Sequence, residues 1–286
     1  MMNMIQMVGI MVCCFFVSVL TLSLLHRHIN VKLGNAMFII ADVVFFFAWN
    51  VAAYQLGWLE SGSMTLGNIS PFIMTLIPFT LLFSPKVRDI CNCAIAFLWF
   101  GMFLALMISP EHAYIFSSNI EANLIYAGEA ACHLLASVYG FYLIISGQVK
   151  CNVKSLGKAL VCMYSVITFG VILNFLFHTN NFGMDPYGGA SIYMLDIFGS
   201  FEATLVAYYL GVLLVLTLGM QIGHGVQRLV DKVNTEDSLE NAEQAADTAV
   251  EATDVAVESP VEATDVALDS KKIPAPDEKD EECVVK

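Results

Sequence analysis

The chain has 286 residues, of which 57% are hydrophobic and only 14% are charged. Soluble globular domains carry about 25% charged residues, so this composition excludes an ordinary soluble domain and predicts a membrane protein. Most of the formal net charge of −13 comes from residues 231–286, which hold 17 acidic and 5 basic side chains, whereas residues 1–230 hold 9 acidic and 8 basic ones. The chain shows no basic stretch that would suggest a nucleic-acid partner, and we expect none.

Apolar windows of about 20 residues predict seven membrane spans. In chain order they cover residues 4–25, 36–58, 64–83, 90–108, 122–146, 157–178 and 201–222. The third window is the weakest because it contains Pro71 and Pro78. We therefore predict an all-α fold in which residues 1–222 form a polytopic bundle of seven transmembrane helices.

Basic side chains alternate between the two sides of these predicted spans. The loops after the first, third, fifth and seventh spans hold nine of them: Arg27, Lys32, Lys86, Arg88, Lys150, Lys154, Lys158, Arg228 and Lys232. The other loops contain acidic residues such as Glu60 and Glu111 but no Lys or Arg. Because Lys and Arg are enriched in cytoplasmic loops, the pattern predicts a multi-pass protein of the cell membrane with its N-terminus outside and its C-terminus in the cytoplasm.

The acidic end of the chain is predicted to lie outside the bundle. Residues 223–246 are expected to continue the last span as a juxtamembrane amphipathic helix. Beyond them, "VEATDVAVESP" at 250–260 is followed by the near-copy "VEATDVALDS" at 261–270. Such acidic, low-complexity sequence buries too little apolar surface to fold alone, so residues 247–286 are predicted to be a disordered tail. The eleven-residue period is also compatible with a coiled coil, and the tail is a candidate binding segment for an unidentified cytoplasmic partner.

Ionisable or strongly polar side chains within a membrane span are costly unless they face protein or water, so they indicate candidate sites. Five of them occur in the predicted spans: Asp42, Glu129, His133, Asn174 and Glu202. Asp42 falls in the cytoplasmic third of its span, whereas the other four fall in the middle or outer part. We expect these four to form a polar cluster that opens to the outside.

Glu129 and His133 are four residues apart, so their side chains can meet on one face of a helix. A carboxylate bonded to one imidazole nitrogen orients the ring and makes the other nitrogen more basic, as in general-base catalysis. The alternative is a structural pair that only satisfies itself inside the bundle. His133 is therefore the candidate catalytic base, and Glu129 the candidate orienting group.

The sixth span is followed by the loop "NFLFHTNNFGMDPYGGASIYMLDIFGS", which is rich in Asn, Gly and aromatic residues. Such a loop fits either a lid over a binding site or an interfacial re-entrant segment. The candidate ligand-binding residues at this end are Asn174, His178, Asn180, Asn181 and Glu202. We expect no metal and no other cofactor, because Cys91 and Cys93 lack the further ligands of a zinc site.

Several motifs between residues 70 and 222 resemble the YwaF-like family of multipass membrane proteins. They are, in order, "LIPFTLLF", "SPKVRD", "SPEHAY", the histidine-centred "EAACHLLASVYG" and "LNFLFHTNNFG". Relatives of this family include eukaryotic membrane acyltransferases that act on phospholipids. The resemblance implies a membrane-lipid partner and an acyl-transfer site that includes the histidine at position 133.

The same resemblance implies a nucleophile on the proline-containing span. No cysteine occurs in "LIPFTLLF", but related membrane hydrolases use a threonine–histidine pair, which makes Thr75 and Thr80 the candidates here. The alternative is that each hydroxyl bonds a backbone carbonyl near the Pro78 kink. Two functions therefore remain open: a lipid acyltransferase or hydrolase with His133 as base, and a non-enzymatic transporter or sensor that binds a small polar ligand in an outward-facing cavity.

Overall fold

A computed structural model of the chain describes residues 4–26, 28–55, 69–108, 120–179, 181–184 and 198–257. These residues form seven α-helices and one short 3-10 helix, with no strand among them. The predicted all-α class is therefore confirmed. The chain divides into two compact units, Met1–Asn234 and Thr235–Lys286, and each is described by itself.

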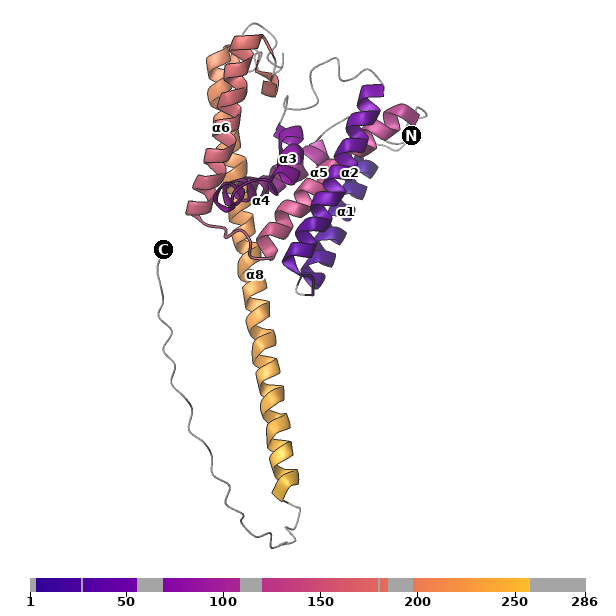
Figure 1. The fold of residues 1–286 in the computed structure, drawn as a ribbon, viewed down its shortest axis with the longest axis vertical. Coiled ribbons are helices and arrows are strands. Elements are labelled where there is room, and N and C mark those ends of the chain that lie inside the picture. Colours follow the sequence, from indigo (N-terminus) through magenta and orange to yellow (C-terminus); the bar gives the residue numbers. More distant parts are fainter. Residues whose placement is uncertain are drawn as a thin grey trace, which may run out of the picture. The chain divides into compact units, whose positions relative to one another are not determined.

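Figure 1 shows the helices of the first unit in chain order. They are α1 (Met4–Leu25), α2 (Val31–Gln55), α3 (Ile69–Phe79), α4 (Pro85–Ile108), α5 (Ile120–Ile145), α6 (Val153–Phe177), the 3-10 helix η3 (Asn181–Gly183) and the first part of α8 (Phe201–Val257). Asn180, a candidate ligand-binding residue, lies outside the described residues.

Five helical stretches are long and apolar enough to cross a membrane. They are Val31–Val51, Pro85–Met107, Ala127–Ile145, Val153–Phe177 and Phe201–Thr235, which match the predicted second, fourth, fifth, sixth and seventh spans. The stretches at the predicted first and third spans, Gly9–Leu25 and Ile69–Phe79, are shorter. At 1.5 Å per residue, α3 covers only about half of the roughly 30 Å hydrocarbon core. The protein is thus a helical membrane protein, with five candidate spans among the described residues.

The outer faces of these helices carry large apolar side chains that the bundle leaves uncovered. Phe47 of α2, Phe177 of α6 and Leu214 of α8 are each exposed over more than half of their surface. Contiguous apolar surface of this extent is rare on soluble monomers, and lipid chains are its natural solvent. The exposed residues therefore support the membrane assignment independently of hydropathy.

Helix α4 lies at the centre of the packing. It packs against α5 and α6, while α2 and α1 pack against α5. The buried core includes Phe97 of α4 and Tyr139 of α5.

Two glycines let the central helices approach to backbone contact. A Cβ atom on Gly219 of α8 would lie 2.0 Å from the backbone oxygen of Phe97, and one on Gly140 of α5 would lie 2.6 Å from that of Ile95. Only glycine fits at such distances, and small residues at helix contacts are the usual device for close packing in membranes. On α8 the pattern continues one turn later at Gly223, whose Cβ would lie 2.8 Å from the sulfur of Cys151.

The Arg88 side chain stabilises the connection between α3 and α4. Pro78 lies near the end of α3, and the helix stops directly after it. The Arg88 guanidinium donates to the carbonyl oxygens of Thr80, Leu81 and Phe83 at 2.8, 3.2 and 3.2 Å. These carbonyls follow the last turn of a helix and have no partner within it, so the arginine satisfies them in place of water.

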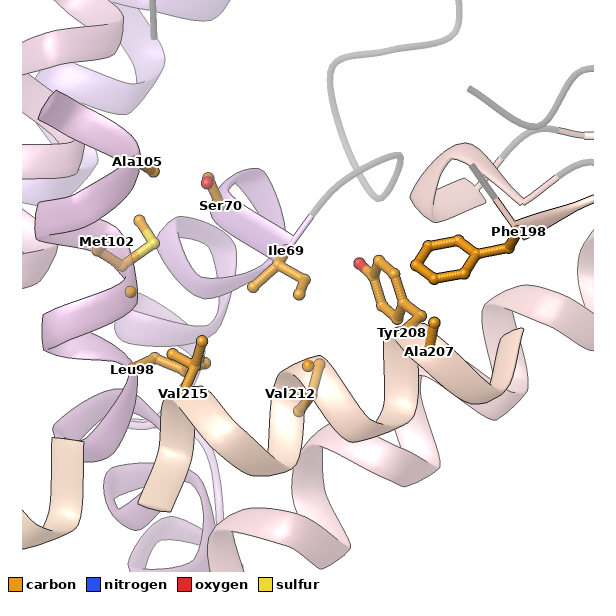
Figure 2. Close-up of a pocket in the computed structure, with 12 residues that line it drawn as sticks. Ile69, Ser70, Leu98, Met102, Ala105, Phe198, Ala207, Tyr208, Val212 and Val215 are labelled. Atoms are coloured by element: carbon orange, nitrogen blue, oxygen red, sulfur yellow. The ribbon is translucent and has the colours of Figure 1, made fainter. Parts of the chain in front are cut away.

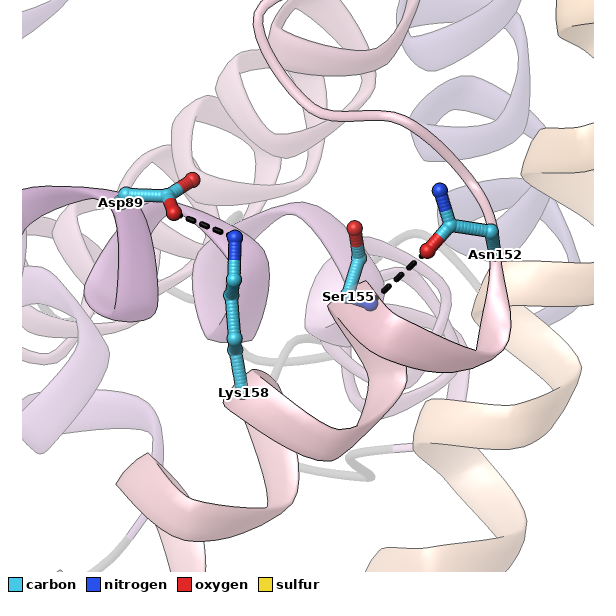
Figure 3. Close-up of polar contacts among 4 residues, drawn as sticks. All are labelled: Asp89, Asn152, Ser155 and Lys158. Atoms are coloured by element: carbon cyan, nitrogen blue, oxygen red, sulfur yellow. Dashed lines mark hydrogen bonds and ion pairs between the residues drawn. The ribbon is translucent and has the colours of Figure 1, made fainter. Parts of the chain in front are cut away.

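Polar contacts also fix the start of α6 (Figure 3). Asn152 is its N-cap, and the Asn152 side chain accepts a hydrogen bond from the backbone N–H of Ser155 at 2.9 Å. One turn further on, the Lys158 ammonium pairs with the Asp89 carboxylate of α4. The cap and the ion pair together set where α6 begins relative to α4.

In the second unit, the described residues belong to α8, which ends at Val257. The expected juxtamembrane helix 223–246 falls within α8. Residues 247–257, which were expected to be disordered, are helical as well. Residues 258–286, the rest of the predicted tail, lie outside the described residues. The coiled-coil hypothesis stays a prediction.

The contact at Gly219 leads to a first prediction. Gly219→Ala should lower the free energy of unfolding by about 1–3 kcal/mol, because the new methyl group would force α8 away from the Phe97 carbonyl. Gly225→Ala is the matched control, since a Cβ there meets nothing within 4 Å. It should be neutral or stabilise by up to about 1 kcal/mol through helix propensity. Thermal unfolding in detergent measures both, and equal stability of the two variants would disprove the close contact.

Candidate functional site

The two polar residues of α5 are joined through the backbone. His133 is buried, and its Nδ1 donates a hydrogen bond to the backbone carbonyl of Glu129 at 2.9 Å. Because a carbonyl can only accept, Nδ1 carries the proton, and a neutral ring has its lone pair on Nε2. Ser137 repeats the pattern one turn later by donating to the backbone carbonyl of His133 at 2.7 Å. The hydrogen bond to the backbone of Glu129 thus fixes the ring in the tautomer that a general base needs. The role assigned to the Glu129 carboxylate stays a prediction.

Both candidate nucleophiles lie on or directly after α3, and each hydroxyl bonds a backbone carbonyl. Thr75 donates to Pro71 at 2.8 Å, and the buried Thr80 donates to Ile77 at 2.6 Å. These are the local bonds expected near a proline, where a helix loses a backbone donor. In this conformation neither hydroxyl offers its proton to a base, so their catalytic role stays a prediction.

Asn174 holds together the turn that follows α6. Its side chain is fully buried, and its Nδ2 donates to the backbone carbonyls of Asn181 and Met184 at 3.0 and 2.7 Å. Its Oδ1 accepts from the Thr179 hydroxyl at 2.9 Å and from the backbone and side-chain nitrogens of Asn181 at 2.7 and 2.9 Å. These bonds use the hydrogen-bonding capacity of the amide within the turn. A ligand would have to displace one of them to reach it.

The remaining candidates lie at the same end of α6 and α8. His178 is the C-cap of α6 in the left-handed conformation, with φ of 53°. Glu202 lies in the first turn of α8, where a carboxylate complements the helix dipole. Asn174 and Asn181 lie together in the turn, and their role as ligand-binding residues stays a prediction. Helix α6 contacts α4, η3 and, through Tyr164 and Phe175, α8. The hydrogen bonds described above for Asn174 and for His133 of α5 do not join the two residues, and the single outward-facing cluster stays a prediction.

An apolar cavity lies elsewhere, among α3, α4 and α8 (Figure 2). Its volume is about 400 Å³, which is within the range of small-molecule sites. The lining is Ile69, Ser70, Leu98, Gly101, Met102, Ala105, Phe198, Ala207, Tyr208, Gly211, Val212 and Val215. Figure 2 shows the rings of Phe198 and Tyr208 at one end and Leu98 and Met102 at the other.

None of the residues that the sequence singled out lines this cavity. Its walls are apolar residues of three helices, and only the hydroxyls of Ser70 and Tyr208 add side-chain polarity. Apolar residues on a membrane helix carry no visible signal for a binding site, because lipid-facing and cavity-facing positions have the same composition. The glycines of the lining were the available hint: Gly101 lets Val215 of α8 approach closely, and Gly211 faces open space.

Asp42 is the least expected polar residue of the described chain. Its side chain is fully buried, and neither carboxylate oxygen has a hydrogen-bond partner among the described residues. Helix α2 begins at Val31, so Asp42 lies near the middle of the stretch Val31–Val51. The position of Asp42 in the cytoplasmic third of the span was predicted for a span that begins at residue 36, and its depth in the membrane stays a prediction. Buried polar atoms without partners are rare in native proteins, so this carboxyl needs a physical reason.

No group of three or more His, Cys, Asp or Glu side chains placed to hold a metal ion occurs in the described part of the chain. Comparisons of the chain with protein-family models, with curated proteins and with solved structures found no match. The resemblance to the YwaF-like family therefore stays a prediction.

Asp42 leads to a second prediction. Asp42→Leu should raise the free energy of unfolding by about 1–3 kcal/mol, because it removes a buried polar group that has no partner. Asn50→Leu on the same helix is the control: the Asn50 amide already donates to the Phe46 carbonyl at 2.7 Å, so its removal should give no such gain. Thermal unfolding in detergent compares the two variants. A lower unfolding temperature for Asp42→Leu would mean that the carboxyl is paired in the folded protein.

Proposed function

We propose that the protein binds a membrane lipid or a similar amphiphile in the apolar cavity among α3, α4 and α8. The lining of the cavity supports this proposal: ten of its twelve residues have apolar side chains or none, and two carry a hydroxyl. Water finds few hydrogen-bond partners on such walls, whereas burial of an acyl chain against them is favourable. The Ser70 and Tyr208 hydroxyls would receive the polar end of the ligand.

Of the two functions left open by the sequence, a non-enzymatic lipid sensor or transporter has the stronger support. The Thr75 and Thr80 hydroxyls donate to backbone carbonyls, and the Asn174 amide is used within its own turn. An apolar cavity also favours an amphiphile over the small polar ligand that was first considered. Lipid hydrolysis or acyl transfer is the second candidate, supported by the orientation of the His133 ring, and membership of the YwaF-like family would favour it.

The cavity proposal predicts where a lipid probe will react. A phosphatidylcholine with a diazirine on its acyl chain, reconstituted with the protein in nanodiscs, should cross-link to residues 98–105 and 207–215. Gly211→Phe should abolish most of this signal, because a Cβ at Gly211 meets nothing within 4 Å and the ring can fill the cavity. Leu210→Phe is the control, since the neighbouring Leu210 is exposed and does not line the cavity.

Mass spectrometry of the cross-linked peptides gives the result. If both variants lower the signal equally, or if labelling is uniform over the apolar outer faces, the lipid contacts only the outside of the bundle and the proposal fails.

We also propose seven spans in the cell membrane, with the N-terminus outside and the C-terminus in the cytoplasm. Nine Lys and Arg side chains on one side of the predicted spans and none on the other support this topology.

The topology predicts which sides of the protein are accessible on intact cells. His112→Cys, in a variant without other cysteines, should react with an impermeant thiol reagent, and Lys154→Cys in the same background should react only after permeabilisation. His112 lies outside the described residues, whereas Lys154 is exposed near the start of α6. The reverse pattern would contradict the orientation, and equal labelling of both positions on intact cells would contradict the single span, 122–146, that separates them.

A further inference from the structure

A second pocket lies at the other end of the bundle, where α1 and α5 end and α2 begins. Its volume is about 640 Å³. Five ionisable side chains carry its charge, and we call it the basic pocket: His26, Lys150, His224, Arg228 and Asp231. Sequence positions as far apart as 26 and 231 thus meet in one place, which the sequence analysis did not anticipate.

The frame of the basic pocket is rigid. The Gln227 side chain of α8 donates to the carbonyls of Ile144 and Val149 at 3.2 and 2.6 Å, and it accepts from the backbone N–H of Cys151 at 2.9 Å. On the other side of the same turn, Asn35 of α2 and Gln148 exchange hydrogen bonds of 2.7 and 3.1 Å. A turn held from two helices positions its charged neighbours before any ligand arrives, which favours binding.

The charge of the pocket favours anions. Lys150 and Arg228 are exposed cations, and the imidazole of His224 adds a further donor. Asp231 is the one carboxylate among the residues that line the pocket, and its side chain takes part in an interaction within the protein. Burial raises the pKa of the Cys151 thiol to about 12, so this wall of the pocket adds no negative charge near neutral pH. His26 donates from Nδ1 to the Ser23 carbonyl at 2.7 Å, which fixes the orientation of its ring in the pocket lining.

The length of α8 allows the pocket to reach the level of the lipid phosphates when the helix enters the hydrocarbon core at Phe201. Arg228 follows the first residue of α8, Phe201, by 27 residues, which is about 40 Å along a helix. The hydrocarbon core is about 30 Å thick, so the Arg228 end of α8 extends past it into the headgroup region. His26 follows directly on the end of α1, and Lys150 lies in the turn between α5 and α6, so both lie at helix ends near Arg228 in the pocket lining.

We propose that the basic pocket binds a phosphate group, carried either by the headgroup of an anionic lipid or by a soluble phosphate ester. The Arg228 guanidinium of α8 and the Lys150 ammonium of the turn after α5 supply donors from two elements, with the imidazole of His224 beside them, and such a set suits the several oxygens of a phosphate better than a single carboxylate. The volume exceeds that of one phosphate and admits a phosphorylated sugar-sized headgroup. Basic pockets between helices on the cytoplasmic side are a general mode of headgroup recognition. This site is distinct from the apolar cavity and does not depend on its proposed function.

Binding to the full chain in a neutral detergent tests the proposal. The probes are a short-chain phosphatidylinositol bisphosphate, the matching inositol trisphosphate without acyl chains, and short-chain phosphatidylcholine as the uncharged-headgroup control. The phosphorylated probes should bind and phosphatidylcholine should not. Tighter binding of the lipid than of inositol trisphosphate identifies a lipid headgroup as the ligand, whereas equal binding identifies a soluble phosphate ester.

Variants separate the pocket from general surface charge. Lys150→Gln and Arg228→Gln should each weaken binding by about tenfold, the effect of one charge-assisted hydrogen bond, whereas the charge-conserving Arg228→Lys should retain most of it. Lys154→Gln and Lys86→Gln are the controls, because both lysines are exposed and neither lines the pocket. Unfolding temperatures without ligand verify that each variant is folded. The proposal is overturned if no phosphorylated probe binds, or if the controls weaken binding as much as the pocket variants.

Discussion

The structure of the first unit depends on the contact between Gly219 of α8 and the backbone carbonyl of Phe97 in α4. A methyl group would not fit there, so the distance between the two helices is set by the backbones themselves. Residues 207–215, before this contact, line the apolar cavity, and residues 224–234, after it, line the basic pocket. The apolar cavity, which is lined by both α4 and α8, therefore depends directly on this interhelical distance, and the basic pocket lies further along the same helix α8. In a membrane, where lipid surrounds both helices equally, such close packing is what holds them together.

A common rule explains the polar residues of the helices. Ser23, Thr75, Ser137 and Thr217 each donate to a backbone carbonyl one turn earlier in the same helix. Without water in the hydrocarbon region, polar groups must be satisfied internally, and this local bond is the most accessible solution. A polar residue in an apolar helix is thus weak support for a site until its local acceptors are considered. Among the described residues, Asp42 has no such bond, and the buried Asn92 Oδ1 and Tyr142 hydroxyl also lack a hydrogen-bond partner.

The fold class and most helix positions were predictable because they follow from composition and hydropathy. The extent of α3 was less predictable from hydropathy, because the helix ends after Pro78 and the Arg88 side chain then donates hydrogen bonds to the carbonyls that follow it. Asn174 was grouped with Asn181, because the two are close in sequence. The two cavities were not predictable, since their walls come from residues far apart in the chain and depend on how closely the helices pack. The pattern "GMQIG" at 219–223 carried the one usable signal for that packing and was not recognised.

The three hydrogen bonds of Gln227 have a consequence for the order in which the protein is assembled. The carbonyls of Ile144 and Val149 and the N–H of Cys151 are bound by a side chain that lies more than 70 residues later in the chain. Because synthesis proceeds from the N-terminus, the turn after α5 cannot be completed when α5 itself leaves the ribosome. Until α8 is inserted, these two carbonyls and this N–H must be hydrated at the membrane surface. Insertion of α8 is therefore the event that completes the bundle, although α8 is the last of its helices to be made.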